Sequence, residues 1–187
     1  IYINARLFAW LIGLPDPVFI SGYSGPELDQ ALLSGEVQAR VTNPASLVQR
    51  SPEWLVNDMM DFHAIIEIPK GYRLELPEFK SLPTLESFAK NSREKKILAM
   101  FRTFRLVGSP YILPPNVPGD RVQILRAAFR NALSDPALPE EWKKITGEDM
   151  APLMPEEQAQ AIKDIPRGRE TINAFKIIAG GGRLPPR

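Results

Sequence analysis

Three short runs of β-branched, aromatic or alternating apolar residues constrain the fold of this chain most. They are residues 18–20 ("VFI"), 37–41 ("VQARV") and 62–68 ("FHAIIEI"), and glycines and prolines lie close to them. A short apolar run between Gly and Pro is typical of a buried strand, and alternation with polar residues is typical of a half-buried one. The sequence therefore predicts three strands in the first 70 residues.

Helical patterns separate these runs. Residues 4–12 carry apolar side chains at spacings of three to four until Gly13, and residues 26–33 begin at Pro26 and end before Gly35. A shorter helix interrupted by proline is expected over residues 44–58. Because strands alternate with helices, the pattern favours an α/β fold with a parallel-type sheet flanked by helices.

The rest of the chain changes to helices, expected at residues 93–104 and 120–134 and within 135–147, 155–165 and 169–178. The tail, residues 180–187, is expected to be extended and mobile. We therefore divide the chain into an α/β lobe at residues 1–107, and a crossing segment followed by C-terminal helices at residues 108–187.

Composition and motifs argue against several classes of function. The chain has 187 residues, a net charge of +1, 9% aromatic residues and no cysteine, which gives no support for nucleic-acid binding or thiol chemistry. The single histidine, His63, lies in a predicted strand, where a structural or surface role is favoured over catalysis. No hydrolase, zinc-protease, P-loop or EF-hand motif occurs. We therefore expect no enzyme activity, no cofactor and no metal.

The first candidate ligand loop consists of Gly22, Tyr23, Ser24 and Gly25, between a predicted strand and a predicted helix. The first N–H groups of a helix lack intrahelical partners and carry the positive end of the dipole, so they can hold a carboxylate or phosphate. Glycine and serine also favour tight turns without any ligand. The residues alone leave both interpretations open.

A second loop repeats this arrangement at "VTNPAS", residues 41–46, where Asn43 and Ser46 follow a predicted strand. Loops after parallel strands gather at one edge of a sheet, so both loops are expected to face a common crevice. Asn43 is equally suited to be the N-cap of a helix that starts at Pro44.

The stretch "ISGYSGPELDQALLSGEVQAR" resembles the substrate-receptor family of tripartite tricarboxylate transporters, the Bug-type periplasmic solute-binding proteins. Three further segments resemble that family in the same order: "LPEFKSLPTLESFAKN", "SPYILPPNVPGDRVQILRAAFRNALSDPAL" and "IIAGGGRLPPR". The third of the four segments is the most specific. The chain differs at Asn43, where many relatives carry Asp, and at Asn116, where glycine is usual.

The resemblance implies a non-enzymatic periplasmic protein that captures a small organic anion, a carboxylate, and delivers it to the membrane permease subunits of a transporter. It also implies that residues 1–107 form a ligand-binding lobe like that of periplasmic binding proteins, and that residues 108–187 are a helical return segment. It assigns ligand binding to Gly22, Tyr23, Ser24, Gly25, Asn43 and Ser46. It also implies that most of the first of two lobes is missing from this sequence. In that case apolar faces at Leu125, Phe129 and Leu133 would lack a cover, and the alternative is a truncated, dimerising interaction module without transport function.

Overall fold

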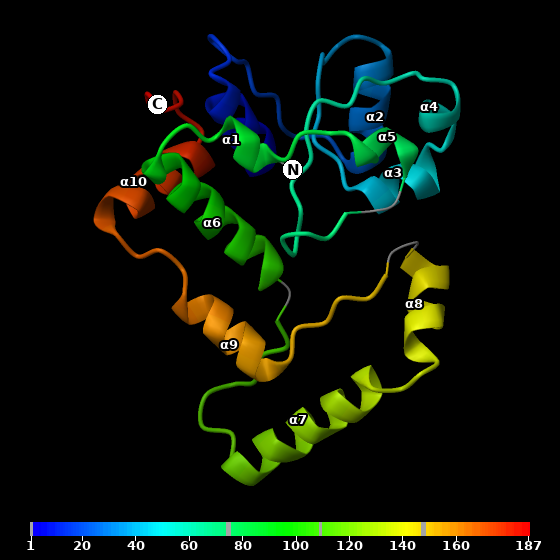
Figure 1. The fold of residues 1–187 in the computed structure, drawn as a ribbon, viewed down its shortest axis with the longest axis vertical. Coiled ribbons are helices and arrows are strands. Elements are labelled where there is room, and N and C mark those ends of the chain that lie inside the picture. Colours follow the sequence, from blue (N-terminus) through cyan, green and yellow to red (C-terminus); the bar gives the residue numbers. More distant parts are fainter. Residues whose placement is uncertain (1, 74–75, 109, 147–148) are drawn as a thin grey trace.

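The fold is helical throughout the part of the chain that the computed structural model describes, which is residues 2–73, 76–108, 110–146 and 149–187 (Figure 1). The elements are α1 (Tyr2–Ile12), α2 (Gly25–Leu33), α3 (Pro44–Arg50), α4 (Glu53–Val56), α5 (Pro77–Lys80), η1 (Leu85–Phe88), α6 (Ser92–Leu106), α7 (Gly119–Leu133), α8 (Leu138–Thr146), α9 (Pro155–Lys163) and α10 (Arg169–Ala179). The predicted helices are confirmed, including the ends of α1 and α2 at glycines with positive φ.

The predicted α/β fold with a parallel-type sheet is wrong, because the described residues contain no strand beyond one isolated bridge, a parallel pair between Ile65 and Thr84. Leu85 donates its N–H to the Ile65 carbonyl at 2.8 Å, and Ile65 donates to Pro83 at 3.0 Å. This pairing cannot extend backward because Pro83 has no N–H, and forward the chain turns into η1.

The other two predicted strands also form no ladder. Val37 donates its N–H to the Ala31 carbonyl at 3.1 Å, so the start of the second run closes the end of α2. In the first run, Val18 is 86% exposed and Ile20 49% exposed, although the pattern predicted a buried strand. Both runs are therefore apolar, but among the described residues no neighbouring segment pairs with either run as a strand.

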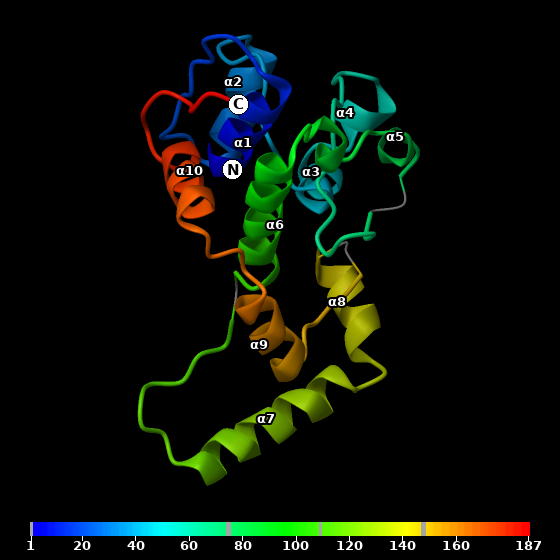
Figure 2. The ribbon, with the colours of Figure 1, turned by 60° about the vertical axis from the view of Figure 1, so that its left-hand side comes forward.

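The main core lies where α1, α6, η1 and α10 meet (Figures 1 and 2). Four of its apolar side chains have no exposed surface: Leu7, Leu11, Ile97 and Ile178. Each such side chain contributes about 1.5–3 kcal/mol by leaving water. The last helix thus packs with the first, and the return segment shares one core with residues assigned to the predicted lobe at residues 1–107.

A second, smaller core forms under α3, α4 and α5. Leu47, Trp54 and Phe79 are its buried members, and the Phe62 ring meets the Phe79 ring edge to face at 5.2 Å between centroids. Leu32 at the end of α2 packs against the same cluster. This second core fixes the positions of α2 and α3, whose first turns carry the predicted ligand loops.

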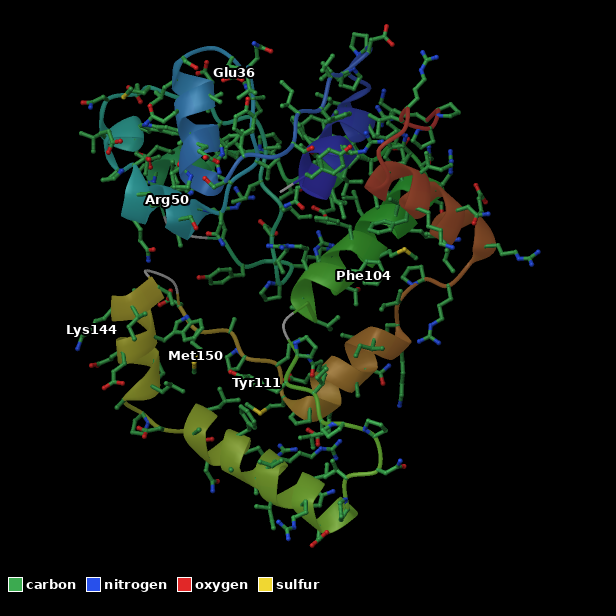
Figure 3. All side chains as sticks on the ribbon, turned by 180° about the vertical axis from the view of Figure 1, so that it is seen from behind. Glu36, Arg50, Phe104, Tyr111, Lys144 and Met150 are labelled. Atoms are coloured by element: carbon green, nitrogen blue, oxygen red, sulfur yellow. The ribbon has the colours of Figure 1, made fainter. Side chains whose placement is uncertain are left out.

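Helices α7, α8 and α9 have no buried residue and extend away from both cores (Figures 1 and 2). We call residues 110–146 and 149–168 the arm. Leu125 is 41% exposed and Phe129 is 37% exposed, and Leu133 is partly exposed, as the sequence led us to expect for uncovered helices. Tyr111 places its ring 4.4 Å from that of Phe129, and Figure 3 shows it between α6 and α7.

The tail, residues 180–187, forms no helix or strand, and side chains from two helices hold its end, residues 183–187. Trp10 donates its indole N–H to the Pro185 carbonyl at 2.9 Å. Arg187 donates to both carboxylate oxygens of Glu94, at 3.2 and 3.0 Å, and to the Phe88 carbonyl at 2.9 Å. The predicted mobility overlooked these long-range partners.

Candidate functional site

The first predicted ligand loop ends at Ser24, the N-cap of α2, and Pro26 lies in the first helical turn. Ser24 donates its backbone N–H to the Glu27 carboxylate at 2.7 Å. This hydrogen bond and one from the Ser24 hydroxyl hold the pKa of Glu27 below its ordinary value. A carboxylate of the chain itself therefore occupies one of the N–H groups that the sequence assigned to a ligand.

The other residues of this loop have different roles. Gly22 adopts φ +108°, a backbone conformation that only glycine reaches without strain. Tyr23 donates its hydroxyl to Glu36, and this hydrogen bond raises the pKa of Tyr23. Figure 3 shows Glu36 and Arg50 near opposite ends of α2, so the Tyr23 hydroxyl is engaged away from Arg50.

Asn43 of the second loop is the N-cap of α3. Its side-chain oxygen accepts the N–H of Ala45 at 2.8 Å and, more weakly, the N–H of Ser46 at 3.5 Å. Pro44 lies at the first helical position. Capping, which the sequence left open as an alternative to ligand contact, is thus one function that Asn43 performs.

Arg40 joins the two loops. Its Nη1 donates to the Gly25 carbonyl at 3.2 Å and its Nη2 to the Thr42 hydroxyl at 3.5 Å, and its side chain is 4% exposed. Its guanidinium also pairs with Asp29 of α2. The expected sheet edge is absent from the described residues, and a buried arginine links the two loops instead.

A second arginine lies at the surface of the same site. Arg50, at the end of α3, approaches Asp29 to 3.7 Å and its side chain is 40% exposed. A Cβ atom added at Gly25 would come within 2.6 Å of Arg50 Nη1, so this glycine provides the room for the guanidinium. Two arginines face one aspartate, so Asp29 cannot neutralise both, and the other carboxylate at this junction is Glu27, which binds the Ser24 N–H.

These three charged residues were missed by sequence reasoning. Asp29 and Arg40 lie within the segment that carries the family resemblance, and Arg50 follows at the end of the next helix. A spacing of charged residues alone does not reveal that they converge, because their meeting depends on how α2 and α3 pack. The arrangement can hold a small anion by a charge-assisted hydrogen bond to Arg50.

Other functional features are sparse in the described residues. His63 lies at the surface. No group of three or more His, Asp or Glu side chains within the described ranges is placed to hold a metal ion. None of the described helices has the length and apolar character that crossing a membrane requires.

No protein-family model matches the chain, and no curated protein or solved structure matches it significantly. The features that define a class are therefore those of the chain itself: a helical protein with two cores, an exposed helical arm and a junction between two helix-starting loops that contains two arginines.

Proposed function

We propose that this chain is part of an extracytoplasmic solute-binding protein, and that it holds a small organic carboxylate between residues 22–25 and residues 43–46. The observation that carries the proposal is the Arg50 guanidinium, which lies beside Gly25 with 40% of its side chain exposed. The four segments that resemble the substrate-receptor family support the same function independently of the fold.

Charge at the junction favours a ligand with a carboxylate. Asp29 is shared by Arg40 and Arg50, so it cannot neutralise both guanidinium groups. Arg40 is buried and its hydrogen bonds go to the two loops, so it positions them. Arg50 is the group that a ligand can reach, and a bidentate pair with a carboxylate is the geometry that arginine favours.

The proposal includes no chemical step. Binding and release are sufficient for a receptor that works in the periplasm and delivers its ligand to the permease subunits of a transporter. Ser24, Asn43 and Ser46 would provide the polar surroundings of the ligand, with Gly22 and Gly25 allowing the close approach. The Tyr23 hydroxyl, which is bonded to Glu36, would not take part. Ser24 can offer its N–H only when Glu27 moves away.

Calorimetric titration with succinate tests this site. Arg50→Gln should weaken binding about tenfold or more, because a hydrogen bond to a charged group contributes roughly 1.5–3 kcal/mol. Gly25→Val should weaken it too, because the added side chain displaces the Arg50 guanidinium. Glu27→Gln should strengthen it, because the competing carboxylate loses its charge.

Lys80→Gln is the matched control, since it removes the same charge from exposed Lys80 at the end of α5. It should leave succinate binding unchanged. Absence of succinate binding by the parent chain, or equal effects of Arg50→Gln and Lys80→Gln, would show that the assigned site is wrong.

We infer a second candidate function, a dimerising interaction module, from the exposed apolar side chains of the arm. Among them are Ile124 at 62%, Trp142 at 42% and Ile145 at 78% exposed, in addition to Leu125 and Phe129. Large apolar side chains left exposed in such number are what a protein interface would cover. The two functions involve different elements and do not exclude each other.

The mass measured by light scattering tests this second function. If the arm mediates dimerisation, the parent chain has twice the monomer mass at micromolar concentration, and Phe129→Lys makes it monomeric. Gln123 lies on the same helix and is already polar and exposed. Gln123→Lys is therefore the control and should leave the mass unchanged. A monomeric parent chain at all concentrations excludes the module.

A further inference from the structure

Arg6 in α1 is a buried cation without an acidic partner. It is 1% exposed. Its guanidinium donates to the carbonyls of Ile178 at 2.7 Å, Ile177 at 3.3 Å and Gly182 at 2.6 Å, through Nε and Nη2. Within the part of the chain that the structure describes, no carboxylate lies at ion-pair distance from it, and Nη1 makes no hydrogen bond.

Such a charge is costly unless a counter-charge compensates it. Carbonyl groups and aromatic faces do so only in part: the Arg6 guanidinium lies 4.8 Å from the centre of the Phe19 ring and 5.5 Å from that of Tyr2. Retaining an arginine here is understandable if an anion occupies the adjacent space for part of the time.

A cavity of about 800 Å³ adjoins Arg6, between α1, residues 13–19 and the tail. This size is suited to a small molecule. Arg183 and Arg187 line it as well, and Asp16 is its acidic lining residue among the described residues. Asp16 already lies 3.6 Å from Arg183, and Glu94 neutralises Arg187, so the charge of Arg6 remains uncompensated.

Part of the lining is apolar. Tyr2 and Phe19 contribute partly exposed rings, Leu14 and Pro15 contribute aliphatic surface, and Trp10, which is 2% exposed, forms the buried wall. Trp10 is held in place by its hydrogen bond to the Pro185 carbonyl. The cavity therefore combines one unneutralised positive charge with surfaces on which a planar ring can stack.

We propose that this cavity binds a small aromatic monocarboxylate, with the carboxylate at Arg6 and the ring against Tyr2 and Phe19. The site lies beside the main core and is separate from the junction between α2 and α3, so it does not depend on the succinate site. The Trp10 indole N–H is a built-in reporter, because its partner Pro185 lines the same cavity.

Titration with benzoate, monitored by the NMR resonance of the Trp10 indole N–H, tests the proposal. Benzoate should shift this resonance saturably and leave those of Trp54 and Trp142 in place. Benzyl alcohol has the same ring without the charge, and should bind about tenfold or more weakly. No shift with benzoate, or equal affinity for the two compounds, overturns the proposal.

Variants then locate the site. Arg6→Gln should abolish the shift, but Arg6 also fastens the end of α10, so a variant that spares the fold is needed. Leu14 lines the cavity and is 48% exposed. Leu14→Asp supplies a competing negative charge and should weaken benzoate binding at least severalfold. Leu14→Asn, of similar size, should not weaken it. Equal effects of the two variants contradict charge recognition at this cavity.

Arg50→Gln separates the two proposed sites. It should weaken succinate and leave the benzoate-dependent Trp10 shift unchanged. If Arg50→Gln removed both responses, benzoate would be binding at the junction between α2 and α3, and the cavity proposal would be wrong.

Discussion

Glu94 is a buried carboxylate that joins three segments of the chain. It is 1% exposed, and it accepts hydrogen bonds from Arg187 of the tail, from the Lys90 N–H at 2.6 Å and from the Asn91 amide at 3.0 Å. Burial by itself raises the pKa of Glu94, but these donors outweigh it and hold the pKa below the ordinary value of 4.5. The ionised form is therefore the one that the fold stabilises.

The stability of the main core should consequently depend on acid. Because the folded-state pKa of Glu94 lies below the unfolded-state value, its contribution is complete above pH 4.5 and is lost as the pH falls through the folded-state pKa. Glu94→Gln should lower the free energy of unfolding at pH 7 by roughly 1–3 kcal/mol and flatten this part of the pH profile. Urea unfolding at a series of pH values measures both effects.

Glu141→Gln on exposed α8 is the comparison for that experiment. It should leave the free energy of unfolding at pH 7 within about 0.5 kcal/mol of the parent value. Identical acid profiles for the parent chain and Glu94→Gln would show that Glu94 does not provide the acid-sensitive link.

Single residues were predictable from the sequence where backbone conformation decided their role. Asn116 stands where the resembling family has glycine, and it adopts φ 65°, a left-handed conformation that asparagine tolerates better than most residues. The capping role of Asn43 was also foreseen as one alternative. The competing carboxylate of Glu27 and the bridging Arg40 were not, because side-chain partners depend on packing that the sequence pattern does not specify.

At the scale of elements, α3 allows the two possible roles of Asn43 to be separated. Asn43→Ala removes the acceptor for Ala45 and Ser46 and should lower the free energy of unfolding by about 1 kcal/mol. Asn43→Asp retains a good cap, so it should leave stability nearly unchanged. If Asn43 also faces the ligand, the new charge in Asn43→Asp should repel succinate and weaken its binding.

Urea unfolding and succinate calorimetry on the same two variants measure these effects. A stable Asn43→Asp that binds succinate as tightly as the parent chain would restrict Asn43 to capping. A loss of stability in Asn43→Asp as large as in Asn43→Ala would contradict the capping geometry itself.

The helices were predicted correctly, whereas the predicted sheet is absent from the described residues, and the difference has a physical reason. A helix satisfies its backbone groups within one segment, so apolar spacing together with Pro26 and Gly35 suffices to place α2. A strand needs a partner elsewhere in the chain. Among the residues that the structure describes, residues 62–68 pair only at Ile65 with Thr84, and Pro83 prevents the pair from growing.

At the scale of the whole molecule, the two cores and the arm should differ in local stability. Amides of α1, α6 and α10 surround side chains without exposed surface, whereas α7, α8 and α9 bury none. Hydrogen exchange reports local opening, so amides of the arm should exchange much faster than those of the main core. Mass spectrometry of peptic peptides after short labelling measures this difference.

Repeating the labelling at several protein concentrations provides the control. Protection of α7 that increases with concentration would indicate that the arm associates with a second copy. Protection of α7 equal to that of α6 even at high dilution would contradict an exposed arm in the isolated chain.

The contact between Arg6 and Ile178 joins residues 172 positions apart, and it has a consequence for biosynthesis. A ribosome that adds roughly 5–20 residues per second needs about 10–30 s to make the chain between them. During that time α1 leaves the ribosome before α10 exists, so Leu7 and Leu11 lack part of their final apolar surroundings. The nascent N-terminal helix is thus a segment that a chaperone can bind until α10 emerges.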